Sequence, residues 1–137
     1  EKAGAKILTG GKKIRETCYT PTVILNPPDS VKVSCSEIFG PVVLVYTYKD
    51  RQEAIDRANN VPFSFQAAVF TKNIDTAWDT VSKLNAAAVM VNDHTAFRVD
   101  WMPFAGHKAS GLGVGGMVYT MEEMTEEKMV VFRSSGL

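Results

Sequence analysis

Short apolar blocks, separated by polar and turn-forming residues, run along most of this 137-residue chain. Apolar or β-branched blocks of this length predict strands, and they comprise residues 5–9, 20–25, 31–34, 42–46, 67–71 and 87–91. Pro21 makes the second block an edge strand or the approach to one, because proline has no N–H to donate to a sheet. The blocks 42–46 and 87–91 lack polar alternation, so we expect burial on both faces, as in a parallel sheet.

Two segments between these blocks have the 3.6-residue spacing of helices. Asp50 caps the first, with Glu53 three residues later as in a capping box, and residues 59–62 end it. Asn73 or Asp75 caps the second, which carries Ala77, Trp78, Val81 and Leu84 at helical spacing. The order strand, helix, strand, helix, strand predicts an α/β fold with a mostly parallel sheet and crossover helices. In such sheets the chemistry gathers at the carboxyl ends of strands.

The C-terminal part has a different pattern. Residues 111–116 match G-x-G-x-x-G letter for letter, but no strand precedes them and too few residues follow for a dinucleotide-binding unit. We therefore interpret them as a flexible or tightly turned surface segment. Residues 117–127 predict a helix, and residues 128–133 predict a final strand.

Composition and charge narrow the class of protein. Hydrophobic residues make up 45% of the chain and charged residues 22%, as in an ordinary globular domain or one lobe of a larger one. Fifteen basic and fifteen acidic residues balance, which excludes a chain-wide basic surface for nucleic acid or anionic lipid. No apolar run approaches the roughly 20 residues of a membrane span. The chain does not begin with methionine, and we expect it to be part of a longer protein.

The cysteines and histidines offer little evidence of chemistry. Cys18 and Cys35 are the only thiols, which favours a reduced, cytoplasmic protein over a secreted disulfide scaffold. Their spacing to each other and to His94 and His107 matches no metal motif. Cys35 and Glu37 are a nucleophile and base two residues apart, but buried structural thiols are the simpler interpretation. The histidines are general-base candidates or ordinary loop residues.

The best candidate site is the stretch 37–43. A carboxylate, Glu37, precedes an aromatic ring, Phe39, and Gly40-Pro41 then turns the chain into an apolar run. A carboxylate can accept two hydrogen bonds from a sugar diol, and a ring can pack against a flat heterocycle. The two side chains are a plausible clamp for a ribose and its attached base.

A second candidate lies in the long loop that follows the block 87–91. Arg98 stands there among aromatic residues, including Phe104. An arginine in apolar surroundings suits a carboxylate or phosphate. The alternatives are a salt bridge to Asp100, a solvated loop, or plain packing of the aromatic residues.

Several motifs in order resemble the C-terminal part of the NAD(P)-dependent aldehyde dehydrogenases. Residues 36–42 are similar to that family's E-E-I-F-G-P-V element, and residues 103–113 resemble its P-F-G-G-x-K-x-S-G-x-G element. Between them, residues 67–71 and 89–92 resemble the A-A-V-F-T and V-x-V-N strands. The resemblance covers essentially the whole chain.

The resemblance implies roles for the candidate residues. Glu37 would bind the hydroxyls of the nicotinamide ribose, and Phe39 would position the nicotinamide ring of NAD or NADP. Phe104 would line the pocket for a small aldehyde, and Arg98 would favour an anionic one. Residues 1–125 would be a partial catalytic α/β domain, and residues 126–137 a C-terminal strand of the oligomerisation region in a homo-oligomer.

The departures from the family pattern matter as much. The nucleophilic cysteine, the general-base glutamate and the glycine-rich cofactor loop of the family lie upstream of this chain. We therefore expect the chain to hold no catalytic residue, to be inactive alone and not to bind NAD(P) alone. Ser36, Ala105 and residues 114–116 also depart from the family's motifs. The alternative is a stand-alone, non-catalytic binding or assembly module that keeps the fold.

Overall fold

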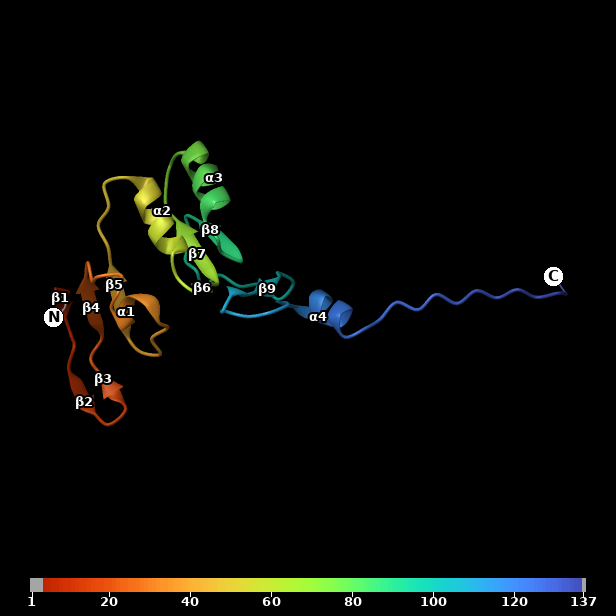
Figure 1. Cartoon of the computed structure of the whole chain (residues 1–137), viewed down its shortest axis with the longest axis horizontal. Helices are drawn as coiled ribbons and strands as arrows, with labels where there is room; N and C mark the ends of the chain where they lie inside the picture. Colours follow the sequence, from red (N-terminus) through yellow and green to blue (C-terminus); the bar gives the residue numbers. More distant parts are fainter. Residues whose placement is uncertain (1–3, 137) are drawn as a thin grey trace. The chain divides into compact units, whose positions relative to one another are not determined.

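The computed structural model describes residues 4–136, and the chain divides into two compact units, residues 1–62 and 63–137. Residues 1–3 and 137 lie outside the described part of the chain. Each unit builds its own small sheets, in part from predicted strands and in part from two- or three-residue strands that the pattern did not predict (Figure 1). Both units combine helices with small sheets, so the α/β class is confirmed.

A three-stranded sheet organises the first unit. Its order is β1 (Lys6–Thr9), β4 (Thr22–Leu25) and β5 (Val42–Val45). β4 pairs antiparallel with β1 and parallel with β5, in a register that runs from Thr22 opposite Val42 to Leu25 opposite Val45. A hairpin of β2 (Lys13–Arg15) and β3 (Cys18–Tyr19) connects β1 to β4. β4 is therefore central, which corrects the expectation of an edge strand; Pro21 lies just outside it and removes no ladder hydrogen bond.

Two further expectations in this unit are wrong. Residues 31–34 do not form a strand but enter a single helical turn, α1 (Lys32–Cys35). Its hydrogen bonds are local, from Ser34 N to Val31 O and from Ser36 N to Lys32 O, so they need no neighbouring strand. The faces of β5 also differ: Val43 and Val45 are 58% and 39% exposed, while Val42 and Leu44 are half-buried. β5 is thus covered on one face only within this chain.

Helix α2 (Arg51–Asn59) completes the first unit. Asp50 begins it as predicted, because its carboxylate accepts a hydrogen bond from Gln52 N. The reciprocal bond from Glu53 that defines a capping box is not found among the described residues. Ile55 is the buried side chain of this helix.

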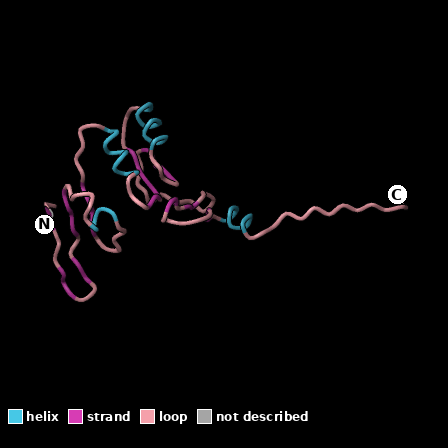
Figure 2. Tube along the Cα trace, in the orientation of Figure 1, coloured by secondary structure: helices cyan, strands magenta, loops and turns pink. Residues whose placement is uncertain are grey.

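The second unit contains a parallel pair and two short antiparallel pairs. β7 (Gln66–Val69) and β8 (Ala88–Val91) run parallel and are joined by α3 (Ile74–Lys83). β6 (Phe63–Ser64) pairs with β10 (His107–Lys108), and β9 (Phe104–Ala105) pairs with β11 (Val114–Gly115). Helix α4 (Met117–Glu123) follows directly (Figure 2). β5 and β7 belong to different sheets among the described residues, so the two parallel pairs, β4–β5 and β7–β8, are separate.

Helix α3 packs through its smallest residues. Asn73, not Asp75, caps it by accepting a hydrogen bond from Thr76 N at 2.9 Å. Ala77 and Thr80 are its buried residues, whereas Trp78 is 69% exposed although it shares the predicted spacing. Helical spacing identified the helix, but it did not identify which face of α3 is covered.

The C-terminal segment differs most from expectation. Helix α4 ends at Glu123 rather than at residue 127. Residues 128–133 form no strand with the described part of the chain and are drawn as loop in Figure 2. A strand exists only through its hydrogen-bonded partner, and no partner for this segment lies among residues 4–136. None of the described helices has the length and apolar character needed to cross a bilayer.

Candidate functional site

The loop that carries Glu37 and Phe39 lies in the first unit, immediately before β5. It turns tightly, because Gly40 N donates to Ile38 O at 2.9 Å and Val42 N donates to Gly40 O at 2.8 Å. Thr22 N donates to Pro41 O at 2.8 Å and so ties the turn to β4. The loop therefore lies at the amino end of β5, not at the carboxyl end where sheet chemistry was expected.

Both candidate side chains of this loop point into solvent. The Phe39 ring is 95% exposed. The Glu37 carboxylate is exposed as well, and no hydrogen bond or ion pair engages it within the described residues. A carboxylate with unused acceptor oxygens and a ring with free faces have the chemistry that a sugar diol and a flat heterocycle require.

The second unit brings Arg98 and Phe104 together. The guanidinium carbon of Arg98 lies 4.5 Å from the centroid of the Phe104 ring, within cation–π distance. The edge of Phe65 packs against the same ring, with centroids 5.1 Å apart and planes at 85°. No ion pair joins Arg98 to Asp100 in the part of the chain that the structure describes. Of the alternatives for Arg98, the structure therefore shows the aromatic contact.

This cluster combines an exposed cation with partly exposed aromatic rings. Phe104 stands on β9 and remains 44% exposed, and Phe65 is 39% exposed. Arg98 is itself exposed, with its positive charge above an apolar ring. An arginine supported in this way keeps donors free for a carboxylate, sulfonate or phosphate.

The other candidates gain no catalytic geometry. Asp93 accepts a hydrogen bond from the backbone of His94 at 2.7 Å and lies 3.9 Å from His94 Nε2. Both side chains are more than half exposed, and His94 Nδ1 accepts from Ala96 N, so this is an ordinary polar turn. The Cys35 thiol donates a hydrogen bond to Val31 O at 3.5 Å, a local contact within α1 that is consistent with a structural residue. His107 is exposed on β10.

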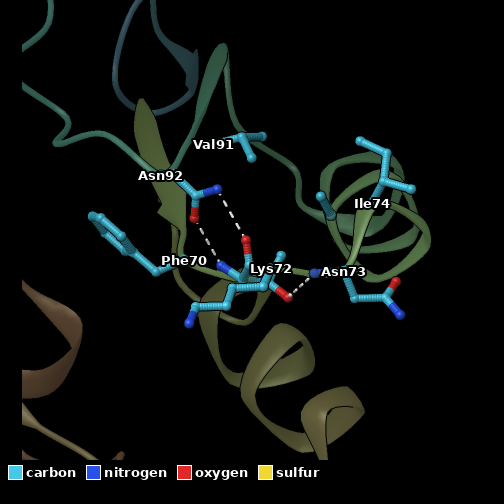
Figure 3. A pocket seen from close by; sticks show the side chains of 8 residues that line it. Phe70, Lys72, Asn73, Ile74, Val91 and Asn92 are labelled. Carbon is cyan, nitrogen blue, oxygen red and sulfur yellow. Dashed lines mark hydrogen bonds between the residues drawn. The ribbon is translucent and has the colours of Figure 1, made fainter.

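A hollow at the carboxyl ends of β7 and β8 escaped the sequence analysis (Figure 3). It has a volume of about 680 Å³ and is lined mainly by Phe70, Lys72, Asn73, Ile74, Ala77 and Val91. Asn92 closes one side of it: its side chain accepts from Thr71 N at 2.8 Å and donates to Thr71 O at 2.9 Å. Asn92 has a φ of 58°, which asparagine tolerates better than most residues. An asparagine directly after a strand was the one sequence signal for this arrangement.

The residue types that bind metals do not cluster in the described part of the chain. The described residues include no group of three or more histidine, cysteine, aspartate or glutamate side chains that could hold a metal ion. Cys18 and Cys35 are free thiols, each half-buried.

Comparisons with known proteins match the motifs. A sequence profile of the aldehyde dehydrogenase family matches residues 1–130. The 3-sulfolactaldehyde dehydrogenase of Priestia aryabhattai is 40% identical over 128 residues, which cover 93% of this chain and 27% of that protein. The lactaldehyde dehydrogenase of Methanococcus maripaludis is 40% identical over 131 residues, covering 96% and 28%.

Solved structures agree. Aldehyde dehydrogenase 21 of Physcomitrella patens, in complex with the reaction product succinate, matches with a TM-score of 0.89 at 38% identity, over 98% of this chain and 28% of that chain. Similar structures at 35% and 37% identity include complexes with NADP and NAD+. The chain spans 27–28% of the length of the curated relatives named above.

Proposed function

This chain belongs to the aldehyde dehydrogenase family, and from that premise we propose that the protein containing it oxidises a small aldehyde to a carboxylic acid with NAD or NADP. The observation that carries the proposal is the loop before β5. It presents an unpaired carboxylate and a fully exposed ring two residues apart. The motif order along the chain supports the same conclusion.

Glu37 and Phe39 hold the nicotinamide end of the cofactor in this proposal. The Glu37 carboxylate accepts hydrogen bonds from the ribose hydroxyls, and the Phe39 ring packs against the nicotinamide. When bound, NAD(P) supplies the hydride acceptor. The turn at Gly40-Pro41 is tied to β4 through Pro41 O, which fixes where the two side chains stand on the unit.

Arg98 and Phe104 form the substrate side. Phe104 offers an apolar surface for the carbon chain of the aldehyde, and Arg98 attracts an anionic group at its far end. The names of two similar proteins support an anionic aldehyde: 3-sulfolactaldehyde carries a sulfonate, and succinate carries a second carboxylate. Lactaldehyde, in the name of another relative, has no charge, so a neutral substrate is the alternative.

The residues that perform the chemistry lie elsewhere in the protein. By the family pattern, the cysteine nucleophile and the base that activates water precede this chain. The 137-residue chain by itself is inactive in this proposal. A stand-alone module would need a self-sufficient core, but the buried apolar residues among those described are few: Pro27, Ile55, Ala77 and Met90.

We propose that residues 126–137 form a C-terminal oligomerisation segment of a cytoplasmic homo-oligomer. Within it, residues 128–133 would pair as a strand. Met129, Val131 and Phe132 are 87%, 80% and 92% exposed. Apolar side chains of this kind on an unpaired segment favour association.

The test uses the full-length polypeptide and its Glu37→Gln variant. Reduction of NAD+ and NADP+ is followed with succinic semialdehyde and with butanal, an uncharged aldehyde of equal length. We expect turnover by the wild-type protein, with a lower KM for succinic semialdehyde, and about tenfold lower kcat/KM for the cofactor in Glu37→Gln, because a charged acceptor is lost. Glu16→Gln, an exposed change in the β2–β3 turn, is the matched control and should have no effect. Absence of turnover by the wild-type protein with any aldehyde, or an unchanged kcat/KM for the cofactor in Glu37→Gln, contradicts the proposal.

A further inference from the structure

The glycine-rich segment 111–116 has a structural partner that explains its shape. Glu123, in the last turn of α4, accepts a hydrogen bond from Val114 N through Oε1 at 3.1 Å. Gly113 lies between them with a φ of +73°, and a Cβ at this position would stand 2.9 Å from the same Glu123 oxygen. Glycine suits both features of this position, the left-handed backbone and the close approach of the carboxylate. The segment is therefore a turn held by one side chain of α4.

This turn connects to the proposed substrate wall through β11. Val114 and Gly115 pair with Ala105 and Phe104 on β9. The approach at Gly115 is close, since a Cβ there would lie 3.2 Å from Phe104 O. β11 is the strand that pairs with β9 within the described part of the chain. Whatever fixes β11 therefore fixes the backbone that carries the Phe104 ring.

We propose that Glu123 is a positioning residue: by holding Val114, it aligns β11 with β9 and keeps Phe104 in place beneath Arg98. The inference rests on the proposed function for the role of Arg98 and Phe104 toward substrate. Glu123 itself does not touch the substrate. Its effect passes through the backbone of β11, the β9–β11 pairing and the 4.5 Å contact between Phe104 and Arg98.

The neighbouring glutamate provides the matched control. Glu122 is exposed on the same turn of α4 and has the same charge, but its side chain makes no hydrogen bond to the glycine turn among the described residues. Glu122→Ala therefore removes a carboxylate without releasing Val114. Glu123→Gln keeps an oxygen that can accept from Val114 N, whereas Glu123→Ala keeps none.

The first measurement is hydrogen exchange of the full-length protein, read on peptides that cover residues 102–116. We expect Glu123→Ala to accelerate exchange there by about tenfold, because the turn loses a charge-assisted bond. Glu123→Gln should retain most of the protection, and Glu122→Ala all of it. Unchanged exchange in Glu123→Ala overturns the inference, whether or not the protein oxidises aldehydes.

The second measurement separates positioning from general stability. In Glu123→Ala the KM for succinic semialdehyde should rise about threefold to fivefold, the equivalent of a lost cation–π contact. The KM for butanal should rise less, by no more than about twofold, since butanal uses the Phe104 surface but has no charge for Arg98 to attract. The kcat for both aldehydes should stay within about twofold, because neither residue takes part in the chemical step. Faster exchange with an unchanged KM overturns the link to substrate. A wild-type protein without activity contradicts the proposed function, while the exchange result still decides whether Glu123 fixes β9.

Discussion

The two parallel strand pairs, β4–β5 and β7–β8, are closed alike at their carboxyl ends but differ in what connects them. In each pair an asparagine follows one strand and donates its backbone N–H to the last residue of the other, from Asn26 to Val45 and from Asn92 to Val69, both at 2.8 Å. Both asparagines have positive φ, 44° and 58°. The same local solution therefore closes two separate sheets.

The partners of the two side chains differ. Asn92 binds two backbone groups of Thr71. Asn26 binds one backbone group of Thr47, its N–H at 2.9 Å, and the Thr47 hydroxyl at 3.1 Å. The β7–β8 closure thus depends on main-chain atoms alone, while the β4–β5 closure depends partly on the identity of residue 47.

The crossovers differ more. Helix α3 has ten residues and buries Ala77 and Thr80, whereas α1 has four residues and buries none. The loop with Glu37 and Phe39 belongs to the weaker crossover. The position of the proposed cofactor loop therefore depends on the register of β4 and β5 and on the Gly40-Pro41 turn, and not on a packed helix.

The largest expected effect comes from removing the asparagines. We expect Asn92→Ala to lower the local free energy of opening by about 2 kcal/mol and Asn26→Ala by about 1 kcal/mol, because only Asn92 satisfies two backbone groups. Native-state hydrogen exchange of the β7–β8 and β4–β5 amides measures both values in one protein. Asn92→Gly, which permits positive φ, should recover part of the loss. Equal effects at the two sites would remove the distinction between the closures.

The helix caps give the next effect. Asn73→Ala should destabilise the start of α3 by about 1 kcal/mol, and Asp50→Ala the start of α2 by about half as much. The reason is geometric: Asn73 accepts from Thr76 N at 2.9 Å, but Asp50 accepts from Gln52 N at 3.3 Å. Exchange rates of these two amides report each cap. Asn73→Asp preserves the acceptor and serves as the control; a larger effect at Asp50 would contradict this ranking.

Much of this architecture could be predicted from local pattern. The strands β5, β7 and β8 and the helices α2 and α3 lie where apolar runs and helical spacing place them, and Asp50 and Asn73 cap as expected. Caps and periodicity depend on residues a few positions apart, so the sequence reveals them directly.

The parts that could not be predicted depend on distant partners. Residues 31–34 have β-branched side chains but no neighbouring strand, and local hydrogen bonds make them a helical turn. The two-residue strands β9 and β11 are too short to have a period. The side-chain bonds of both asparagines join residues 21 positions apart. The asparagine after each strand is visible in the sequence, but its partner is not known before the strands are paired.

The candidate site divides along the same line. The proposed clamp of Glu37 and Phe39 was recognisable because it occupies three consecutive residues. Arg98 was recognisable as an arginine among aromatics, but only the fold shows that its contact is Phe104 and not Asp100. Glu123 had no sequence signal, since its partner Val114 lies nine residues away across a glycine turn.

The smallest expected effect is the sharpest test of the comparison. Thr47→Val removes the hydroxyl that accepts from Asn26 Nδ2, and it should weaken protection of β4–β5 by about 0.5 kcal/mol. Thr71→Val keeps both bonds to Asn92, because they use the backbone N–H and C=O of residue 71. Valine has the same branched shape as threonine, so packing changes little in either variant. Hydrogen exchange should therefore respond at β4–β5 and remain unchanged at β7–β8.

Thr71→Val also removes the hydroxyl acceptor for Asn73 N at 3.2 Å, so any change there should appear at the start of α3 and not in the strands. If Thr71→Val loosens β7–β8 as much as Thr47→Val loosens β4–β5, the two closures are equivalent and the main-chain character of the second has no energetic consequence.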